Sequence, residues 1–130
     1  MRSAWRHLIP LTVLLVDDDP DMRHYLRTCL GGPGLDVERV LEAADGVEAL
    51  RLVRSGGVDL VISDIVVPGL DGRALCRAIR AIPELDEVAV LLISGEDGAG
   101  SGEGDADGFL AKPFNSRQLM AALEDLIPGR

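Results

Sequence analysis

Four short apolar stretches constrain the fold of this chain most, because each of them ends in a particular polar side chain. They are LTVLLV (11–16) before Asp17, Asp18 and Asp19, VDLVIS (58–63) before Asp64, VAVLLI (88–93) before Ser94, and GFLA (108–111) before Lys112. Stretches of this length, rich in Val, Ile and Leu, are typical of strands buried on both faces of a parallel sheet. Because the carboxyl ends of such strands open on one edge, we expect carboxylates, a hydroxyl and an ammonium to meet in one crevice.

Helical patterns separate these stretches along the whole chain. A first helix is expected to bury Met22, Tyr25, Leu26, Cys29 and Leu30 on one face. A further strand covers about 36–42, and a helix at about 46–55 begins at the N-cap Asp45 and turns Val47 inward with Leu50 and Val53. Helices after Pro68 and at about 116–127 complete the alternation. The pattern predicts an α/β fold, a flavodoxin-like doubly wound five-stranded parallel sheet in the order 2-1-3-4-5.

One crossover differs from the others. GEDGAGSGEGDADG, at about 95–108, contains six glycines and five acids and no large apolar side chain. Four of those glycines alone would cost a helix on the order of 4 kcal/mol relative to alanine. We therefore expect the fourth helix of the alternation to be shortened, absent or disordered there.

Length and composition indicate one soluble domain. The 130 residues carry a net charge of −9, which argues against nucleic acid or an anionic membrane as a direct partner. Cys29 and Cys76 are expected on opposite faces of the sheet, so no disulfide is predicted and a reducing cytoplasm fits. Arg2 and Arg6 before an apolar run resemble the start of a signal peptide, but three aspartates come after the run without a small-residue cleavage site. We divide the chain into an N-terminal extension (1–10), the domain (11–127), expected to stand alone, and a C-terminal tail (128–130).

The predicted crevice has a definite chemistry. Two carboxylates about 5 Å apart at an effective dielectric of about 20 repel each other by roughly 3 kcal/mol, so Asp17, Asp18 and Asp64 need a counter-charge. Oxygen ligands of this kind favour a hard cation, and a site with few protein ligands suits Mg²⁺. Lys112 and Ser94 could hold the oxygens of an incoming phosphoryl group. An aspartate can then act as the nucleophile and form an acyl phosphate.

Four motifs in the right order and spacing resemble the receiver domain of the two-component response-regulator family. They are LLVDDDPDMRHYL for the acidic pair and first helix, SDIVVPGLDG for the phosphoacceptor, LLISGE for the hydroxyl strand and GFLAKPF for the Lys-Pro strand. The resemblance covers about residues 11–127. It implies that Asp64 accepts a phosphoryl group, that Ser94 and Lys112 bind its oxygens, and that the Lys112–Pro113 peptide bond is cis.

The same resemblance implies a metal site and a switch. Asp18, Asp64 and the backbone carbonyl of Val66 would bind Mg²⁺ (or Mn²⁺) directly, while Asp17 would hold a metal-bound water. Ser94 and Phe109 would form the switch, although Phe109 lacks the hydroxyl of the commoner tyrosine. Val66 and Glu96 occupy the two positions that tune the lifetime of the phosphate.

The resemblance implies a signalling protein rather than an enzyme acting on other molecules. A sensor histidine kinase or a histidine phosphotransfer protein would donate the phosphoryl group, and an unknown downstream protein would receive the signal. Two alternatives stay open. The glycine-rich crossover alters the usual output face, which leaves room for an interaction module independent of phosphorylation. Asp17 and Asp19 also imitate the nucleophile motif of a haloacid-dehalogenase-type phosphohydrolase, although no acidic pair for metal comes after Lys112.

Overall fold

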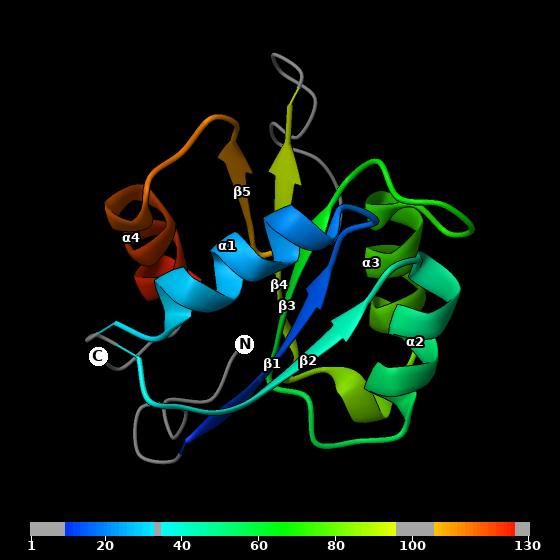
Figure 1. The fold of residues 1–130 in the computed structure, drawn as a ribbon. Coiled ribbons are helices and arrows are strands. Elements are labelled where there is room, and N and C mark those ends of the chain that lie inside the picture. The colour runs from blue at the N-terminus through cyan, green and yellow to red at the C-terminus, as the bar shows by residue number, and fades with distance from the viewer. Residues whose placement is uncertain (1–9, 33–34, 96–105, 127–130) are drawn as a thin grey trace.

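The structure, a computed structural model, describes residues 10–32, 35–95 and 106–126. Strands and helices alternate along the chain (Figure 1). In chain order they are β1 (Leu11–Val16), α1 (Pro20–Leu30), β2 (Val37–Ala43), α2 (Gly46–Arg54), β3 (Leu60–Asp64), α3 (Gly72–Arg80), the 3₁₀ turn η2 (Pro83–Leu85), β4 (Ala89–Ser94), β5 (Gly108–Ala111) and α4 (Ser116–Leu126). All strand pairs are parallel and the order is β2-β1-β3-β4-β5, which confirms the predicted topology.

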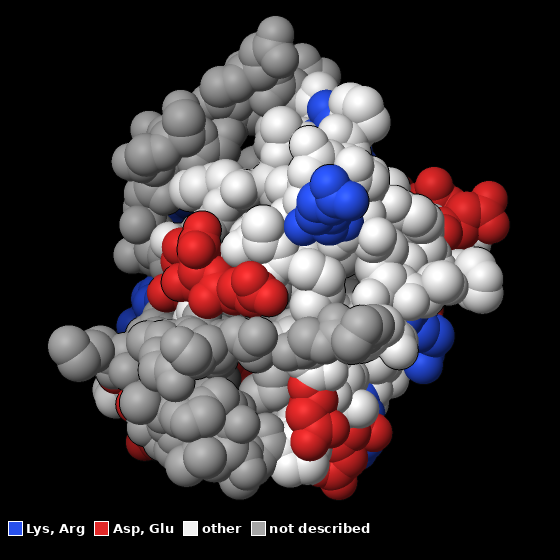
Figure 2. Space-filling model, turned by 90° about the vertical axis from the view of Figure 1, so that its left-hand side faces the viewer, with Lys and Arg blue, Asp and Glu red and all other residues white. Residues whose placement is uncertain are grey.

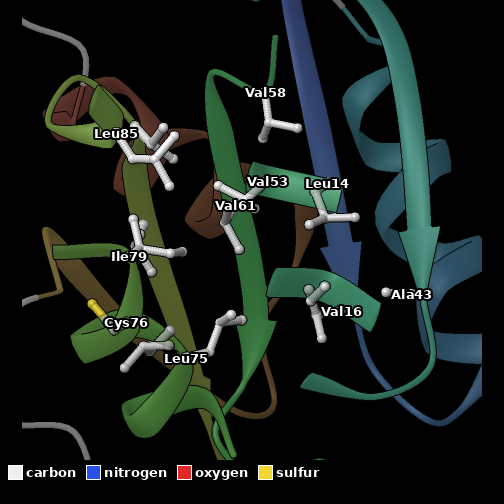
Figure 3. Packing of buried hydrophobic residues seen from close by; sticks show 14 of the residues in the cluster. Leu14, Val16, Ala43, Val53, Val58, Val61, Leu75, Cys76, Ile79 and Leu85 are labelled. Carbon is white, nitrogen blue, oxygen red and sulfur yellow. The ribbon is translucent and has the colours of Figure 1, made fainter. Parts of the chain in front are cut away.

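Helices cover both faces of the sheet, with α1 and α4 on one side and α2 and α3 on the other (Figure 1). Successive strand residues point to opposite faces. In β1, Val13 and Leu15 therefore pack beneath α1 and α4, while Leu14 and Val16 pack beneath α2 and α3 (Figure 3). The sheet thus separates two apolar clusters, one under each helical layer.

Burial follows the position of each strand in the sheet. Every residue of β1, β3 and β4 is buried, as the apolar stretches predicted. The expectation that 108–111 is also buried on both faces is wrong, because β5 is an edge strand that pairs with β4 alone and is partly exposed.

Two predictions for the helical faces need correction. Val47 does not point inward but is 63% exposed, and Tyr25 is 39% exposed. The inward face of α2 is set by Gly46, Ala49 and Val53, which follow the helical period, and Val47 lies about 100° around the helix from Gly46. Asp45 caps α2 as predicted, since its side chain accepts a hydrogen bond from the Glu48 amide at 2.7 Å.

The structure tests the prediction for the two cysteines, but only part of the prediction for the glycine-rich crossover. Cys29 and Cys76 are both buried free thiols, one in each apolar cluster, as expected. The helix predicted to be shortened, absent or disordered spans about 95–108, and residues 96–105 of that segment lie outside the described residues, as do 1–9, 33–34 and 127–130. Within the described part of the chain, no helix is long and apolar enough to cross a bilayer.

A close contact between α2 and the β3–α3 loop requires glycine at position 46. A Cβ built on Gly46 would lie 1.7 Å from the carbonyl oxygen of Leu70, which is backbone and cannot rotate away. The Gly46 amide also donates to the carbonyl of Pro68 at 3.1 Å. The start of α2 and the loop after Asp64 are therefore held directly against each other.

We expect Gly46→Ala to destabilise the fold by about 1–3 kcal/mol or more, since one added methyl group must displace the loop backbone. The free energy of unfolding in urea measures this effect. Gly32→Ala is the control, because its Cβ would meet nothing closer than the Cys29 carbonyl at 3.7 Å. A Gly46→Ala protein as stable as the Gly32→Ala protein would contradict the contact.

Candidate functional site

Strand register brings the predicted site residues together at one edge of the sheet. Val16 lies beside Ser63, Asp64 beside Ile93, and Ser94 beside Ala111. Asp17, Asp64, Ser94 and Lys112 therefore stand at the carboxyl ends of four adjacent strands. Because the strands are parallel and nearly in step, residues far apart in the sequence share one site.

Asp64 and Lys112 form a direct ion pair at the centre of this edge. The Lys112 Nζ lies 2.6 Å from Asp64 Oδ2, and the Val66 amide donates to Asp64 Oδ1 at 3.1 Å. Burial disfavours the ammonium, but the hydrogen bond from Lys112 to Asp64 and the attraction of Asp64, Asp17 and Asp19 outweigh it, so the pKa of Lys112 is raised. Lys112 therefore stays protonated at neutral pH, next to the predicted phosphoacceptor.

Asp17 is the most buried carboxylate of the site, with 3% of the residue exposed. Its Oδ1 accepts a hydrogen bond from the Asp19 amide at 2.9 Å. Burial raises the pKa of Asp17; the Asp19 amide and Lys112 oppose this rise, whereas the nearby Asp64 and Asp18 carboxylates add to it. The carboxylates are thus close enough to destabilise one another's charge, as the sequence predicted.

The donor set of this edge fits a hard divalent cation. It offers carboxylate oxygens from Asp17, Asp18 and Asp64. Burial, and after it the repulsion from Asp64 and Asp18, raises the pKa of Asp17, and a bound cation would offset both effects. Across residues 10–32, 35–95 and 106–126, no three His, Cys, Asp or Glu side chains form a ready-made metal cluster. A metal ion here would therefore complete its shell with water and main-chain oxygen, as Mg²⁺ commonly does.

The start of α3 is packed against the end of β3. A Cβ on Gly72 would lie 2.6 Å from the Asp64 carbonyl oxygen, and the Gly72 amide donates to the Ile65 carbonyl at 2.8 Å. The side chain of Asp71 caps α3 by accepting from the Ala74 amide at 2.8 Å. This packing fixes the position of the backbone at Asp64 and Ile65.

The remaining predicted residues lie at this edge or on the strands that lead to it, with one exception. The Lys112–Pro113 bond is cis, and the buried hydroxyl residue Ser94 accepts the Lys112 amide at its carbonyl, 2.8 Å away. Phe109 packs against the α2–α3 cluster, with the Arg73 guanidinium 5.9 Å from its ring centre. Val66 has an exposed side chain, and Glu96 lies outside the described residues.

Sequence reasoning missed a second group of charged residues beside the site. Arg23 of α1 donates to the Asp17 carbonyl at 2.5 Å and pairs with Glu42 of β2 at 2.6 Å. Glu42 also pairs with Arg27 at 2.8 Å. In the sequence these residues resemble ordinary surface charges, and only the pairing of β1 with β2 brings them together.

A model of the response regulator receiver domain matches residues 13–124. The chain belongs to this family. Response regulator MprA of Mycobacterium sp. (strain KMS) is 37% identical over 92% of the chain. That alignment covers 51% of the relative, so the receiver domain spans about half the length of the curated relatives it matches.

Solved structures give the same assignment. The chemotaxis response regulator CheY4 of Vibrio cholerae superposes with a TM-score of 0.80 at 30% identity, covering 91% of this receiver domain and 99% of the other chain. The receiver domain of the sensor histidine kinase PA1611 from Pseudomonas aeruginosa PAO1 superposes with a TM-score of 0.78 at 28% identity, covering 92% and 98%. That structure is described with a magnesium ion coordinated in its active-site cleft.

The raised pKa of Asp17 predicts a stability change in metal-free buffer. A carboxyl whose pKa is higher in the folded than in the unfolded state costs stability as pH rises from its unfolded value of 3.8 through its folded value. We therefore expect the receiver domain with Asp17→Asn to be more stable than wild type at neutral pH. The gain should shrink toward acidic pH, where Asp17 is protonated.

Urea unfolding across that pH range, in the presence of a chelator, measures the difference. Asp71→Asn is the control, because asparagine caps a helix about as well as aspartate does. A neutral-pH stability of the Asp17→Asn protein below that of wild type would contradict the crowding of the carboxylates.

Proposed function

We propose that this receiver domain is a phosphoacceptor of a two-component phosphorelay, with Asp64 as the residue that is phosphorylated. The observation that supports this most is the 2.6 Å contact between Lys112 and Asp64 within a cluster of buried acids. A partly buried cation paired with one carboxylate, beside a second carboxylate of raised pKa, suits the transfer of a dianionic group. The donor is a sensor histidine kinase or a histidine phosphotransfer protein.

In the proposed step an Asp64 carboxylate oxygen attacks the phosphorus of a phosphohistidine. A phosphorus–oxygen bond forms, the phosphorus–nitrogen bond breaks, and the imidazole leaves with the electron pair and takes a proton from solvent. Lys112 pairs with one phosphoryl oxygen and the Ser94 hydroxyl donates to another. With 12% of its side chain exposed, Asp64 can meet the donor only from the open edge of the sheet.

The cofactor of this proposal is Mg²⁺ or Mn²⁺. Asp18, Asp64 and the Val66 carbonyl would bind it directly, and Asp17 would hold a bound water. When bound, the ion neutralises charge on the phosphoryl group. Asp17 is oriented for its role by the amide of Asp19, which holds its Oδ1.

Signalling in this proposal passes through protein contacts. Phosphorylation of Asp64 changes the hydrogen bonding of Ser94 and the packing of Phe109. The Phe109 ring lies against the α2–α3 cluster and near the Arg73 guanidinium. Val66 and Glu96 tune the rate at which water removes the phosphate, so the domain catalyses only its own phosphorylation and dephosphorylation. Where the face in Figure 2 is described, acidic groups and isolated basic side chains lie among uncharged ones, and the net charge is −9, which suits a protein partner better than nucleic acid or an anionic membrane. The proposed location of the domain is the cytoplasm.

The direct test is labelling by a small phosphodonor such as acetyl phosphate. We expect wild type to gain one phosphoryl group in intact mass only when Mg²⁺ is present, and Asp64→Asn to gain none. Asp71→Asn, a carboxylate replaced at the next helix, should label like wild type. Labelling of Asp64→Asn at the wild-type level would overturn the proposal.

Lys112 gives a second test. We expect Lys112→Gln to slow labelling by about 100-fold, the usual cost of removing one preorganised donor from a charged transition state. Binding of Mg²⁺, measured by calorimetry, should persist because Lys112 is not a ligand. A variant that labels at the wild-type rate would show that the ion pair has no part in transfer.

The same samples separate the two alternatives. Multiple-turnover phosphatase activity that depends on Asp17 and not on Asp64 would indicate the phosphohydrolase. Partner binding that does not change when a beryllofluoride mimic loads the site would indicate a module independent of phosphorylation.

A further inference from the structure

Arg23 connects three elements next to the proposed phosphorylation site. It lies in the first turns of α1, its Nη1 donates to the carbonyl oxygen of Asp17 at 2.5 Å, and its Nε pairs with Glu42 Oε1 of β2 at 2.6 Å. The side chain is 17% exposed, so it is largely withdrawn from solvent. A guanidinium can make both contacts at once because its donors point in fixed, different directions.

Glu42 is itself held firmly. Its Oε2 accepts from Arg27 Nη2 at 2.8 Å and from Arg27 Nε at 3.1 Å. The hydrogen bonds from Arg23 and Arg27 lower the pKa of Glu42, so it stays ionised at neutral pH. Arg23, Arg27 and Glu42 together carry a net charge of +1, and of the two arginines Arg23 is the one that donates to the Asp17 carbonyl. Its particular contribution to the site is therefore that contact and not its charge, which Arg27 supplies equally.

Three hydrogen bonds fix the orientation of Asp17. Its amide donates to the Ala43 carbonyl at 3.1 Å, its Oδ1 accepts from the Asp19 amide at 2.9 Å, and its carbonyl accepts from Arg23. That carbonyl belongs to the peptide group joining Asp17 to Asp18. The contact from Arg23 therefore sets the orientation of the backbone between the two acids.

We propose that Arg23, held by Glu42, is a positioning residue that orients the Asp17–Asp18 backbone for metal binding. This inference rests on the proposed function of the site. Arg23 does not contact the phosphoryl group or the metal. It orients the residues that would bind the metal, as residues hydrogen-bonded to metal ligands commonly do.

The test compares Arg23→Gln and Arg23→Lys with Arg27→Gln in the full chain. Arg27→Gln is the matched control, since it removes the other cation of Glu42 and leaves the Asp17 carbonyl contact intact. The first readout is amide hydrogen exchange at Asp17 and Asp19 in metal-free protein. We expect faster exchange at both amides in Arg23→Gln and wild-type exchange there in Arg27→Gln.

The second readout is the dissociation constant for Mg²⁺ by calorimetry. We expect it to rise about tenfold in Arg23→Gln, the lower end of what such partners contribute, and to change little in Arg27→Gln. Arg23→Lys should shift in the same direction by less, because an ammonium has no rigid fork for both oxygens. If Arg23→Gln does not fold, Arg23→Lys decides the question by the same two readouts.

Wild-type exchange and wild-type Mg²⁺ affinity in the folded Arg23 variants would overturn the inference, even if their free energy of unfolding fell. Equal effects of the Arg23 and Arg27 variants would also overturn it, since they would show a general loosening of α1 on β2. Failure of the wild-type protein to bind Mg²⁺ or to label would instead refute the proposed function.

Discussion

The ion pair between Lys112 and Asp64 joins the ends of two strands that lie on either side of β4. For these side chains to meet at 2.6 Å, β3, β4 and β5 must be adjacent, parallel and nearly in step. The register meets this requirement, since Asp64 lies beside Ile93 and Ser94 beside Ala111. The topology of the sheet is therefore the physical condition for the chemistry of the site.

The site also carries a cost that the rest of the domain must offset. Asp17 is buried beside other carboxylates, which raises its pKa and disfavours the folded state at neutral pH. The two apolar clusters on either side of the sheet supply the stabilisation, with three central strands buried along their whole length. Sites that give up stability for function are common in proteins, and Lys112 supplies only part of the counter-charge here.

Much of this arrangement could be predicted from the sequence, because the signals are local. The bounds of β1 and β5 and the capping of α2 by Asp45 come from apolar runs and turn residues, and the strand order comes from the alternation of strands with helices. The exposure of Val47 was missed because the inward face of α2 is set by Gly46, Ala49 and Val53, and a glycine gives no apolar signal from which that face could be recognised. The Arg23–Glu42 pair was missed for a similar reason: it joins residues that become neighbours only when β1 pairs with β2.

The function of the site depends most on which carboxylate receives the phosphoryl group. Borohydride reduction converts an aspartyl phosphate to homoserine, so peptide mass spectrometry after phosphorylation with acetyl phosphate and Mg²⁺ locates the modified residue directly. We expect homoserine in place of Asp64, with Asp17, Asp18 and Asp19 unchanged. Homoserine in place of Asp17, with Asp64 intact, would contradict the assignment of Asp64 as the phosphoacceptor.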